Sequence, residues 1–231
     1  MVKINVKGTI ISNDDKWIYD WFEMDATSPR DIEKALEQVK KNEEIEVVIN
    51  SGGGSVFAGS EIYSLLKDHK GKITGKIVGL AASAASVIAM GCETLKISPT
   101  AQIMIHRASM VSAGNSEDFE KGAEILKGID KSIANAYILK TGLKQDELLD
   151  LMAKETWLDA KTAKEKGFID EIMFDEDNKI VASFDSGIIP PQIISKLRNE
   201  LKNKKIQEKE NIKDEEGLKI AKAKLQLQLK L

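Results

Sequence analysis

Hydrophobic residues in the first part of the chain follow two different periods. Val2 to Ser12 alternates apolar and polar side chains, which predicts a strand. Ser28 to Asn42 spaces its apolar residues three and four apart, after a serine N-cap and a proline at the first helical position, which predicts a helix. Glu46 to Asn50 is typical of a buried strand, and Val56 to Lys67 predicts a second helix. This alternation favours a parallel sheet with right-handed crossovers.

The centre of the chain continues the same alternation. Lys76 to Leu80 is a short β-branched run that predicts a strand, and Ala84 to Met90 contains good helix formers and no breaker. Ser83 is thereby placed at a helix start, where unpaired N–H groups and the positive end of the helix dipole favour a developing anion. A serine at this place can also be a simple N-cap. A later strand ends in Ile103-Met104-Ile105-His106.

The second half of the chain is mostly helical in pattern. A long helix from Ser116 to Lys140, capped by Ser116 or Asn115 and ended by Gly142, carries an apolar stripe of Phe119, Ala123, Leu126, Ile129, Ile133 and Tyr137. The elements expected next are a helix from Lys144 to Lys154, a helix capped by Asp159 and stopped by Gly167, and a strand from Phe168 to Phe174.

Pro190-Pro191 marks a boundary, so we expect one domain over residues 1–189 and a tail over residues 190–231. Gln192 to Leu231 is rich in lysine and glutamate and contains no aromatic residue, which is typical of a solvated tail that is partly helical or disordered. The last ten residues, from Lys222, alternate strictly. They are either a frayed end or a strand that adds to the exposed edge of another chain.

Composition narrows the class of protein. A net charge of −3 gives no reason to expect nucleic acid as the main partner, and no apolar run is long enough to span a membrane. The N-terminus is strand-like and lacks a signal-peptide core, so we expect a cytoplasmic protein. The single Cys92 excludes an internal disulfide and is expected to be a buried structural thiol. With only two histidines, we expect no histidine-based metal site and no cofactor.

A serine hydroxyl becomes a useful nucleophile only when a base takes its proton. His106 is the best candidate base, because His69 lies in a charged turn where a solvated histidine is expected. Ser83 and His106 are 23 residues apart, room for one strand–helix–strand unit, which places them on neighbouring loops at the carboxyl edge of a parallel sheet. Ser86 is the alternative nucleophile, although one turn inside a helix a serine more often bonds back to the backbone. His106 could also be a core histidine without a catalytic role.

The pattern Ala81-Ala82-Ser83 followed by Met104-Ile105-His106 resembles the proteolytic subunit of the Clp protease, a serine peptidase family. Its nucleophile and base occupy these serine and histidine positions. The resemblance covers Val2 to Phe174 and implies an α/β, ClpP/crotonase-like fold of repeated β-β-α or strand–helix–strand units with a protruding handle helix. The form of residues 79–86 looks most like the branch found in phages and prophages, the head maturation (prohead) proteases.

The resemblance also implies a third catalytic group. The family's aspartate, just before an aromatic-leucine segment, matches Glu155 in Glu155-Thr156-Trp157-Leu158. This carboxylate would orient the imidazole and stabilise its cation. Glutamate departs from the main family but looks typical of the phage branch. Asp159, which can also be a helix N-cap, and Asp170 are the alternatives.

Asn50-Ser51-Gly52-Gly53-Gly54 is expected to form a glycine turn. It resembles the family's Asn-Ser-Pro-Gly-Gly, with Gly52 in place of the proline. The resemblance implies that the N–H groups of Gly53 and Ala84 form the oxyanion hole. No Gly-Lys-Ser/Thr follows, so a phosphate-binding loop is not expected.

These residues together favour a serine endopeptidase with a Ser83, His106 and Glu155 triad. The resemblance implies a homo-oligomeric ring of six or seven subunits, two stacked rings that meet through the long helix, and hydrolysis that is either ATP-independent or assisted by an ATPase partner. The phage-like form suggests capsid or scaffold protein as the protein substrate. The alternatives are a catalytically silent ring that acts as an assembly scaffold, and a crotonase-fold acyl-CoA enzyme, which would share the glycine loops without the serine–histidine pair.

Overall fold

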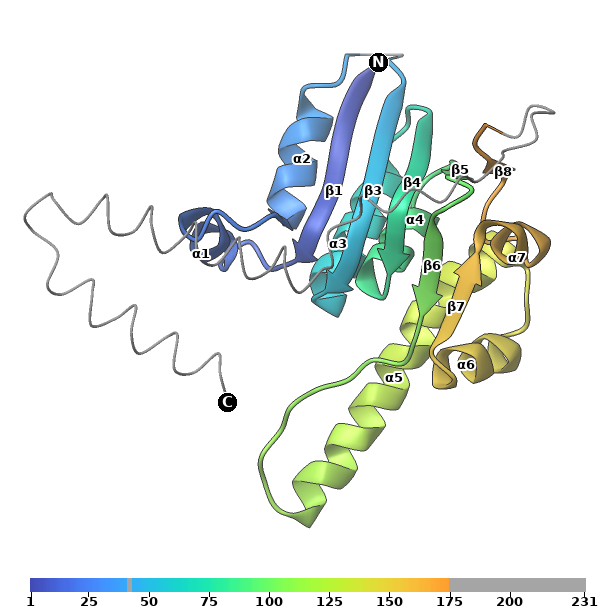
Figure 1. The fold of residues 1–231 in the computed structure, drawn as a ribbon. Coiled ribbons are helices and arrows are strands. Elements are labelled where there is room, and N and C mark those ends of the chain that lie inside the picture. The colour runs from blue at the N-terminus through green and yellow to red at the C-terminus, as the bar shows by residue number, and fades with distance from the viewer. Residues whose placement is uncertain (41–42, 175–231) are drawn as a thin grey trace, which may run out of the picture. The chain divides into compact units, whose positions relative to one another are not determined.

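A mostly parallel β-sheet lies at the centre of the computed structural model, which describes residues 1–40 and 43–174 (Figure 1). The main path of the sheet runs β2-β1-β3-β4-β5-β8, and β6 pairs with both β4 and β7. Every pair is parallel except β6 with β7. The strands are β1 (Val2–Ile10), β2 (Ala26–Thr27), β3 (Ile45–Gly54), β4 (Ile73–Ala82), β5 (Thr94–Ile97), β6 (Gln102–Ile105), β7 (Thr156–Asp159) and β8 (Glu171–Ile172).

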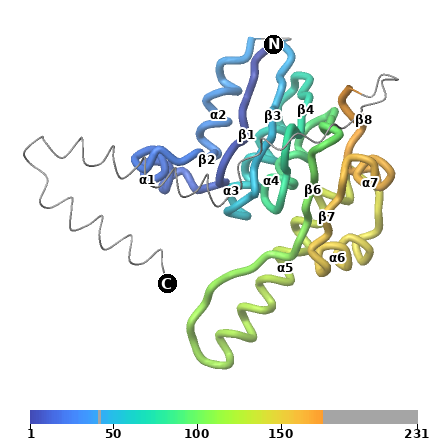
Figure 2. The backbone as a smooth tube through the Cα atoms, in the orientation of Figure 1, coloured from blue at the N-terminus to red at the C-terminus, as the bar shows by residue number. Residues whose placement is uncertain are grey.

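Helices connect the strands as the sequence pattern predicts. Figure 2 follows the chain from the first strands through α3 and α4 to the long α5, and then to α6 and α7 beside β7. The helices α3 and α4 pack against each other, and α4 contacts β3 and β4. The helices are α1 (Lys16–Trp21), α2 (Pro29–Glu37), α3 (Val56–Asp68), α4 (Ala84–Met90), α5 (Ser116–Thr141), α6 (Gln145–Ala153) and α7 (Ala160–Glu165). The predicted parallel α/β sheet with helical crossovers is confirmed.

The core lies between the sheet and the helices packed on it, with α3 and α4 at its centre. Alternate residues of β1, namely Ile4 and Val6, are buried, whereas the residues between them are exposed. The central strands β3 and β4 contribute buried residues such as Ile49 and Ile77, and Ile88 on α4 is also fully buried. Because α4 is buried along its whole length, the residue at its start is held in a rigid environment.

The glycine segment after Asn50 is a strand in the structure and not the turn that the sequence suggested. Gly53 pairs with Thr9 and Gly54 with Ile10, so that β3 continues along β1. Gly53 and Gly54 have φ values of +93° and +150°, which side-chain-bearing residues rarely adopt. The backbone therefore stays in the sheet, and Gly53 lies close to Ala82 at the end of β4.

Several elements differ from the sequence expectation. The strand β5 was not anticipated, because four residues carry too little pattern; it pairs with the first part of β4, and β6 pairs with the last part. The strand expected over Phe168 to Phe174 is paired only at Glu171 and Ile172. Phe168 and Ile169 are buried, so their apolar character reflects core packing after α7. The helix α2 ends at Glu37, earlier than predicted.

The long helix α5 is confirmed from Ser116 to Thr141, with Asn115 as its N-cap and Gly142 in the left-handed conformation at its C-cap. Its apolar stripe divides into two parts. Ile133 and Tyr137 are buried in the core, whereas Phe119 is 54% exposed. Figure 1 shows the first half of α5 extending away from the sheet, as expected for a protruding handle helix.

The predicted boundary at Pro190-Pro191 and the alternating tail from Lys222 to Leu231 lie outside the described residues, and the domain division stays a prediction. Within the part of the chain that the structure describes, no helix is long and apolar enough to cross a membrane. The same part contains no group of three or more histidine, cysteine, aspartate or glutamate side chains arranged to hold a metal ion.

Candidate active site

Ser83 is the single residue between the end of β4 and the start of α4. Its backbone has φ 54° and ψ −125°, an unusual conformation for a residue with a side chain, which costs about 1–3 kcal/mol. The Ser83 N–H donates to the carbonyl oxygen of Met104 at 2.9 Å, and the Ser83 carbonyl accepts from the N–H of Ser86 at 3.0 Å. These bonds hold the sharp turn between β4 and α4.

The side chain of Ser83 does not cap the helix that it precedes. Its Oγ instead lies 2.7 Å from Nε2 of His106. His106 directly follows β6, and the pairing of Ala82 with Met104 sets the ends of β4 and β6 side by side. A hydroxyl and an imidazole nitrogen at this distance satisfy the geometric requirement for general-base activation. The structure thus brings together the predicted nucleophile and the predicted base.

His69 lies far from this edge of the sheet. It is the C-cap residue of α3 and comes shortly before β4 begins at Ile73, whereas Ser83 follows the opposite end of β4. Opposite ends of a strand this long point to opposite edges of the sheet. The structure therefore leaves His106 as the histidine at the carboxyl edge.

Ser86, the alternative nucleophile, is fully buried on α4. Its Oγ donates to the carbonyl oxygen of Ser83 at 2.6 Å and lies 2.7 Å from the hydroxyl oxygen of Tyr137. A hydroxyl that is inaccessible and bonded on both sides cannot reach a substrate carbonyl. The geometry favours Ser83 over Ser86.

Glu155 directly precedes β7 and His106 directly follows β6, but no hydrogen bond joins the Glu155 carboxylate to the imidazole. The antiparallel pairing of Ile105 with Thr156 sets the neighbouring residues, His106 and Glu155, across from each other. The Glu155 side chain is exposed, and its Oε1 accepts a hydrogen bond of 3.4 Å from Nε1 of Trp157. Among the described residues, no carboxylate forms a hydrogen bond or ion pair with His106. The role of Glu155 stays a prediction.

The two alternative acids have other partners. Asp159 pairs with Gln102 at the far end of the β6–β7 ladder, and its Oδ1 caps α7 by accepting from the N–H of Thr162 at 2.7 Å. Hydrogen bonds from Thr162 lower the pKa of the Asp159 carboxyl. Asp170 accepts from the N–H of Leu95 and from Nζ of Lys140, each at 2.6 Å. Neither carboxylate is directed at the imidazole.

Gly53 and Ala84, predicted to form the oxyanion hole, both lie against Ser83. A Cβ placed on Gly53 would come within 2.6 Å of the Ala82 carbonyl oxygen and 2.7 Å of the Ser83 Cβ. The N–H of Gly53 donates to Oγ of Ser51 at 3.1 Å. Ala84 is the first residue of α4, so its N–H is one of the first four in the helix, which have no acceptor within the helix. The structure gathers the two residues but directs the Gly53 N–H toward Ser51.

The loop after His106 is anchored by a residue that the sequence analysis did not single out. Asp130 on α5 is buried, and its Oδ1 accepts from the N–H of Ala108 at 2.8 Å. The Arg107 N–H also donates to the Met152 carbonyl at 3.2 Å. The sequence did contain a signal for this contact, since Asp130 follows Ile129 within the apolar stripe of the helix. A carboxylate that is buried among apolar residues requires hydrogen-bond donors from a neighbouring segment.

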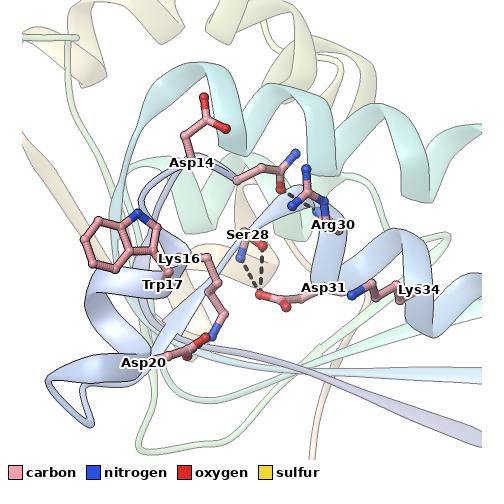
Figure 3. A pocket seen from close by; sticks show the side chains of 9 residues that line it. Asp14, Lys16, Trp17, Asp20, Ser28, Arg30, Asp31 and Lys34 are labelled. Atoms are coloured by element: carbon pink, nitrogen blue, oxygen red, sulfur yellow. Dashed lines mark hydrogen bonds and ion pairs between the residues drawn. The ribbon is translucent and has the colours of Figure 1, made fainter.

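A pocket between α1 and the start of α2 contains none of the predicted site residues (Figure 3). Among its charged side chains, Lys16 binds Asp20, and Asp31 accepts from the N–H and the hydroxyl of Ser28, each at 2.9 Å. Trp17, at its rim, is 67% exposed.

A serine at a strand-to-helix turn, with its hydroxyl on a histidine at the carboxyl edge of a parallel sheet, is the arrangement that α/β serine hydrolases use. The comparison with known families narrows this class. The family model described as Clp protease matches residues 31–176, more than half of the chain. The protein belongs to the Clp protease family.

Individual relatives agree with this assignment. The ATP-dependent Clp protease proteolytic subunit of Deinococcus radiodurans is 31% identical over 140 residues, which are 60% of this chain and 69% of that protein. The proteolytic subunit 1 of Chlamydia abortus is 32% identical over 143 residues, with 60% and 74% covered. A solved structure of a ClpP1 mutant from Listeria monocytogenes superposes with a TM-score of 0.62 at 21% identity and covers 76% of this chain and 93% of that one. That similarity supports the ClpP-like fold.

Proposed function

We propose that the protein is a serine endopeptidase in which Ser83 is the nucleophile and His106 the general base. The distance of 2.7 Å between Ser83 Oγ and His106 Nε2 carries this proposal. The membership of the chain in a peptidase family supports the same chemistry. The unusual backbone conformation of Ser83 also supports the proposal, because strained conformations of this kind cluster at active sites.

The proposed reaction follows from these positions. Neutral His106 takes the Ser83 proton on Nε2 while Oγ forms a bond to the substrate carbonyl carbon. The tetrahedral intermediate then collapses, the C–N bond breaks, and the imidazolium gives its proton to the leaving amine. Water, deprotonated by the same histidine, hydrolyses the acyl-enzyme. Since only the neutral imidazole can act as base, the rate should fall on acidification.

The remaining catalytic groups require small local changes. Glu155 would support the His106 imidazolium once its carboxylate turns away from Trp157, to which it is now bonded at 3.4 Å. Ala84 would donate to the oxyanion from the start of α4, where the helix dipole also favours negative charge. The Gly53 N–H would join it after release from Ser51 Oγ. Each change involves a single hydrogen bond.

The proposed assembly is a homo-oligomeric ring of six or seven subunits, stacked in pairs through α5. Exposed apolar side chains on the first half of this helix, Phe119 and Ile125, support a protein contact there. A ring would enclose the serine and keep folded proteins away from it. We propose protein substrates, capsid or scaffold protein in the phage-like case, and an ATPase partner where the substrate must be unfolded.

An active-site probe tests the proposal. A fluorophosphonate should label the wild-type protein, and peptide mapping should place the label on Ser83. The Ser83→Ala variant should lose the label, whereas Ser64→Ala should keep it, because Ser64 is an exposed serine on α3 whose hydroxyl donates to the Ser60 carbonyl. A protein that is not labelled would favour the silent scaffold. Turnover of an acyl-CoA thioester that survives Ser83→Ala would favour the crotonase-like alternative.

A further inference from the structure

Behind the nucleophile, two buried hydroxyl groups link Ser83 to the long helix α5. Ser86 and Tyr137 are 0% and 1% exposed. Ser86 Oγ lies 2.6 Å from the Ser83 carbonyl oxygen and 2.7 Å from the Tyr137 hydroxyl oxygen. Neither hydroxyl takes part in the reaction proposed above, so their contact needs another explanation.

The direction of these hydrogen bonds follows from the groups themselves. A carbonyl oxygen can only accept, so the one proton of the Ser86 hydroxyl is donated to Ser83. The Tyr137 hydroxyl must then be the donor to Ser86 Oγ. Burial raises the pKa of the Tyr137 phenol, which keeps it protonated and able to donate near neutral pH.

The bonded carbonyl belongs to the strained residue. Ser83 has φ 54°, and its carbonyl accepts from Ser86 N–H at 3.0 Å and Val87 N–H at 3.3 Å, in addition to the Ser86 hydroxyl. The hydroxyl bond is the shortest of the three. Because polarised hydroxyl chains strengthen each bond in the chain, the Tyr137 donor reinforces the contact that fixes the Ser83 peptide.

We infer that Tyr137 and Ser86 form a buried positioning relay, which holds the Ser83 backbone in the orientation that directs its Oγ to His106. The relay touches neither the substrate nor the reacting atoms, so both are positioning residues. It starts on α5, the helix whose exposed first half we propose as a contact surface, and ends on the nucleophile. The inference rests on the proposed serine peptidase function and adds two residues to it.

Removing the phenolic hydroxyl should change catalysis more than stability. In Tyr137→Phe the ring can keep its packing on Phe168, whose ring centroid is 5.8 Å away. A lost hydrogen bond of ordinary strength corresponds to about a tenfold change in rate if the transition state needs it. We expect kcat for a fluorogenic peptide to fall by about tenfold, with KM nearly unchanged because no substrate contact is lost.

The test is a double-mutant cycle of Tyr137→Phe and Ser86→Ala, with kcat, KM and the fluorophosphonate labelling rate measured for each variant. In a relay the double variant should be about as slow as Ser86→Ala alone, since Tyr137 acts only through Ser86. The matched control is Tyr63→Phe, which removes the hydroxyl of a half-buried tyrosine on α3, outside the relay; it should keep wild-type rates.

The outcomes are distinct. A fall in kcat and labelling rate at constant KM, with non-additive effects, supports the relay. Wild-type kcat in Tyr137→Phe, or a lower melting temperature with unchanged kcat, overturns it, because the contact would then be structural only. If Ser86→Ala does not fold, the kcat and labelling rate of Tyr137→Phe against Tyr63→Phe decide the question. A wild-type protein that the probe does not label overturns the proposed function itself, and the relay with it.

Discussion

Glu155 and His106 directly flank the Ile105–Thr156 pair at one end of the antiparallel ladder of β6 and β7, but the Glu155 carboxylate accepts a hydrogen bond from Trp157 and not from the imidazole. The pairing of the adjacent Thr156 with Ile105 sets the position of Glu155, while the direction of its side chain is set by an exposed and long contact of 3.4 Å. A contact of this kind is weak, so the carboxylate can turn toward His106 at little cost.

Replacing Glu155 with Gln should reduce kcat by about three to four orders of magnitude, as loss of the acid does in serine proteases. Trp157→Phe should keep or raise the rate, because it removes the N–H that now holds the carboxylate. Steady-state peptide hydrolysis measures both. Asp159→Asn is the matched control; a severe loss in that variant, with Glu155→Gln active, would move the acid to Asp159.

Ser83→Ala should abolish peptide hydrolysis and leave the fold intact. The change removes one half-buried hydroxyl whose partner is His106 Nε2, so the free energy of unfolding should fall by about 1 kcal/mol or less, on the scale of a lost helix cap. Urea unfolding followed by circular dichroism gives this value. Turnover that persists in Ser83→Ala but disappears in Ser86→Ala would assign the nucleophile to the second serine.

Asp159→Asn should lower stability near neutral pH and have no such effect in acid. Hydrogen bonds from Thr162 lower the pKa of the folded-state carboxyl, so its stabilising contribution is present above the unfolded-state pKa and is lost as the pH falls through the folded-state value. The difference in melting temperature between wild type and variant should narrow accordingly. A difference that stays constant across this acidic range would show that the charge of Asp159 does not stabilise α7.

Cys92 should not react with a thiol reagent in the native protein. Burial raises the pKa of its thiol to about 12, so almost no thiolate forms at mildly alkaline pH, and the side chain is fully buried. With a disulfide reagent at pH 8, one thiol per chain should appear only after denaturation. Rapid labelling without denaturant would mean that the segment between α4 and β5 opens readily.

The proposed ring should be visible in solution. Size-exclusion chromatography with light scattering should give a mass several times the 25.5 kDa of one chain. Phe119→Glu, which places a charge on an exposed apolar position of α5, should weaken the stacking of rings and leave single rings. A monomer near 25.5 kDa that still cleaves peptide would contradict the ring and its enclosed chamber.

Much of the site could be predicted because it depends on backbone topology. The carboxyl ends of neighbouring parallel strands meet at one edge of the sheet, so Ser83 after β4 and His106 after β6 had to be close. The contact between Ser86 and Tyr137 could not be predicted in this way. It depends on how α5 is rotated against α4. The apolar stripe predicts that Tyr137 is buried but not which polar group its hydroxyl contacts.

The orientations of side chains and peptide groups could not be predicted from the sequence. Glu155 could be matched by position, but its exposed side chain has several rotamers of similar energy. The bond from Gly53 N–H to Ser51 Oγ depends on the local backbone conformation of β3, which the expected glycine turn did not describe. The sequence predicts which elements approach one another better than it predicts which polar atoms pair within them.

The two neighbouring glycines of β3 should differ sharply in their freedom to vary. A side chain added at Gly52 would meet nothing within 4 Å, whereas one at Gly53 would collide with the backbone of Ala82 and the Cβ of Ser83. If the protein were mutated repeatedly and selected for activity, we would therefore expect position 52 to accept other residues and position 53 to remain glycine. The position beside the proposed nucleophile is therefore expected to tolerate no side chain.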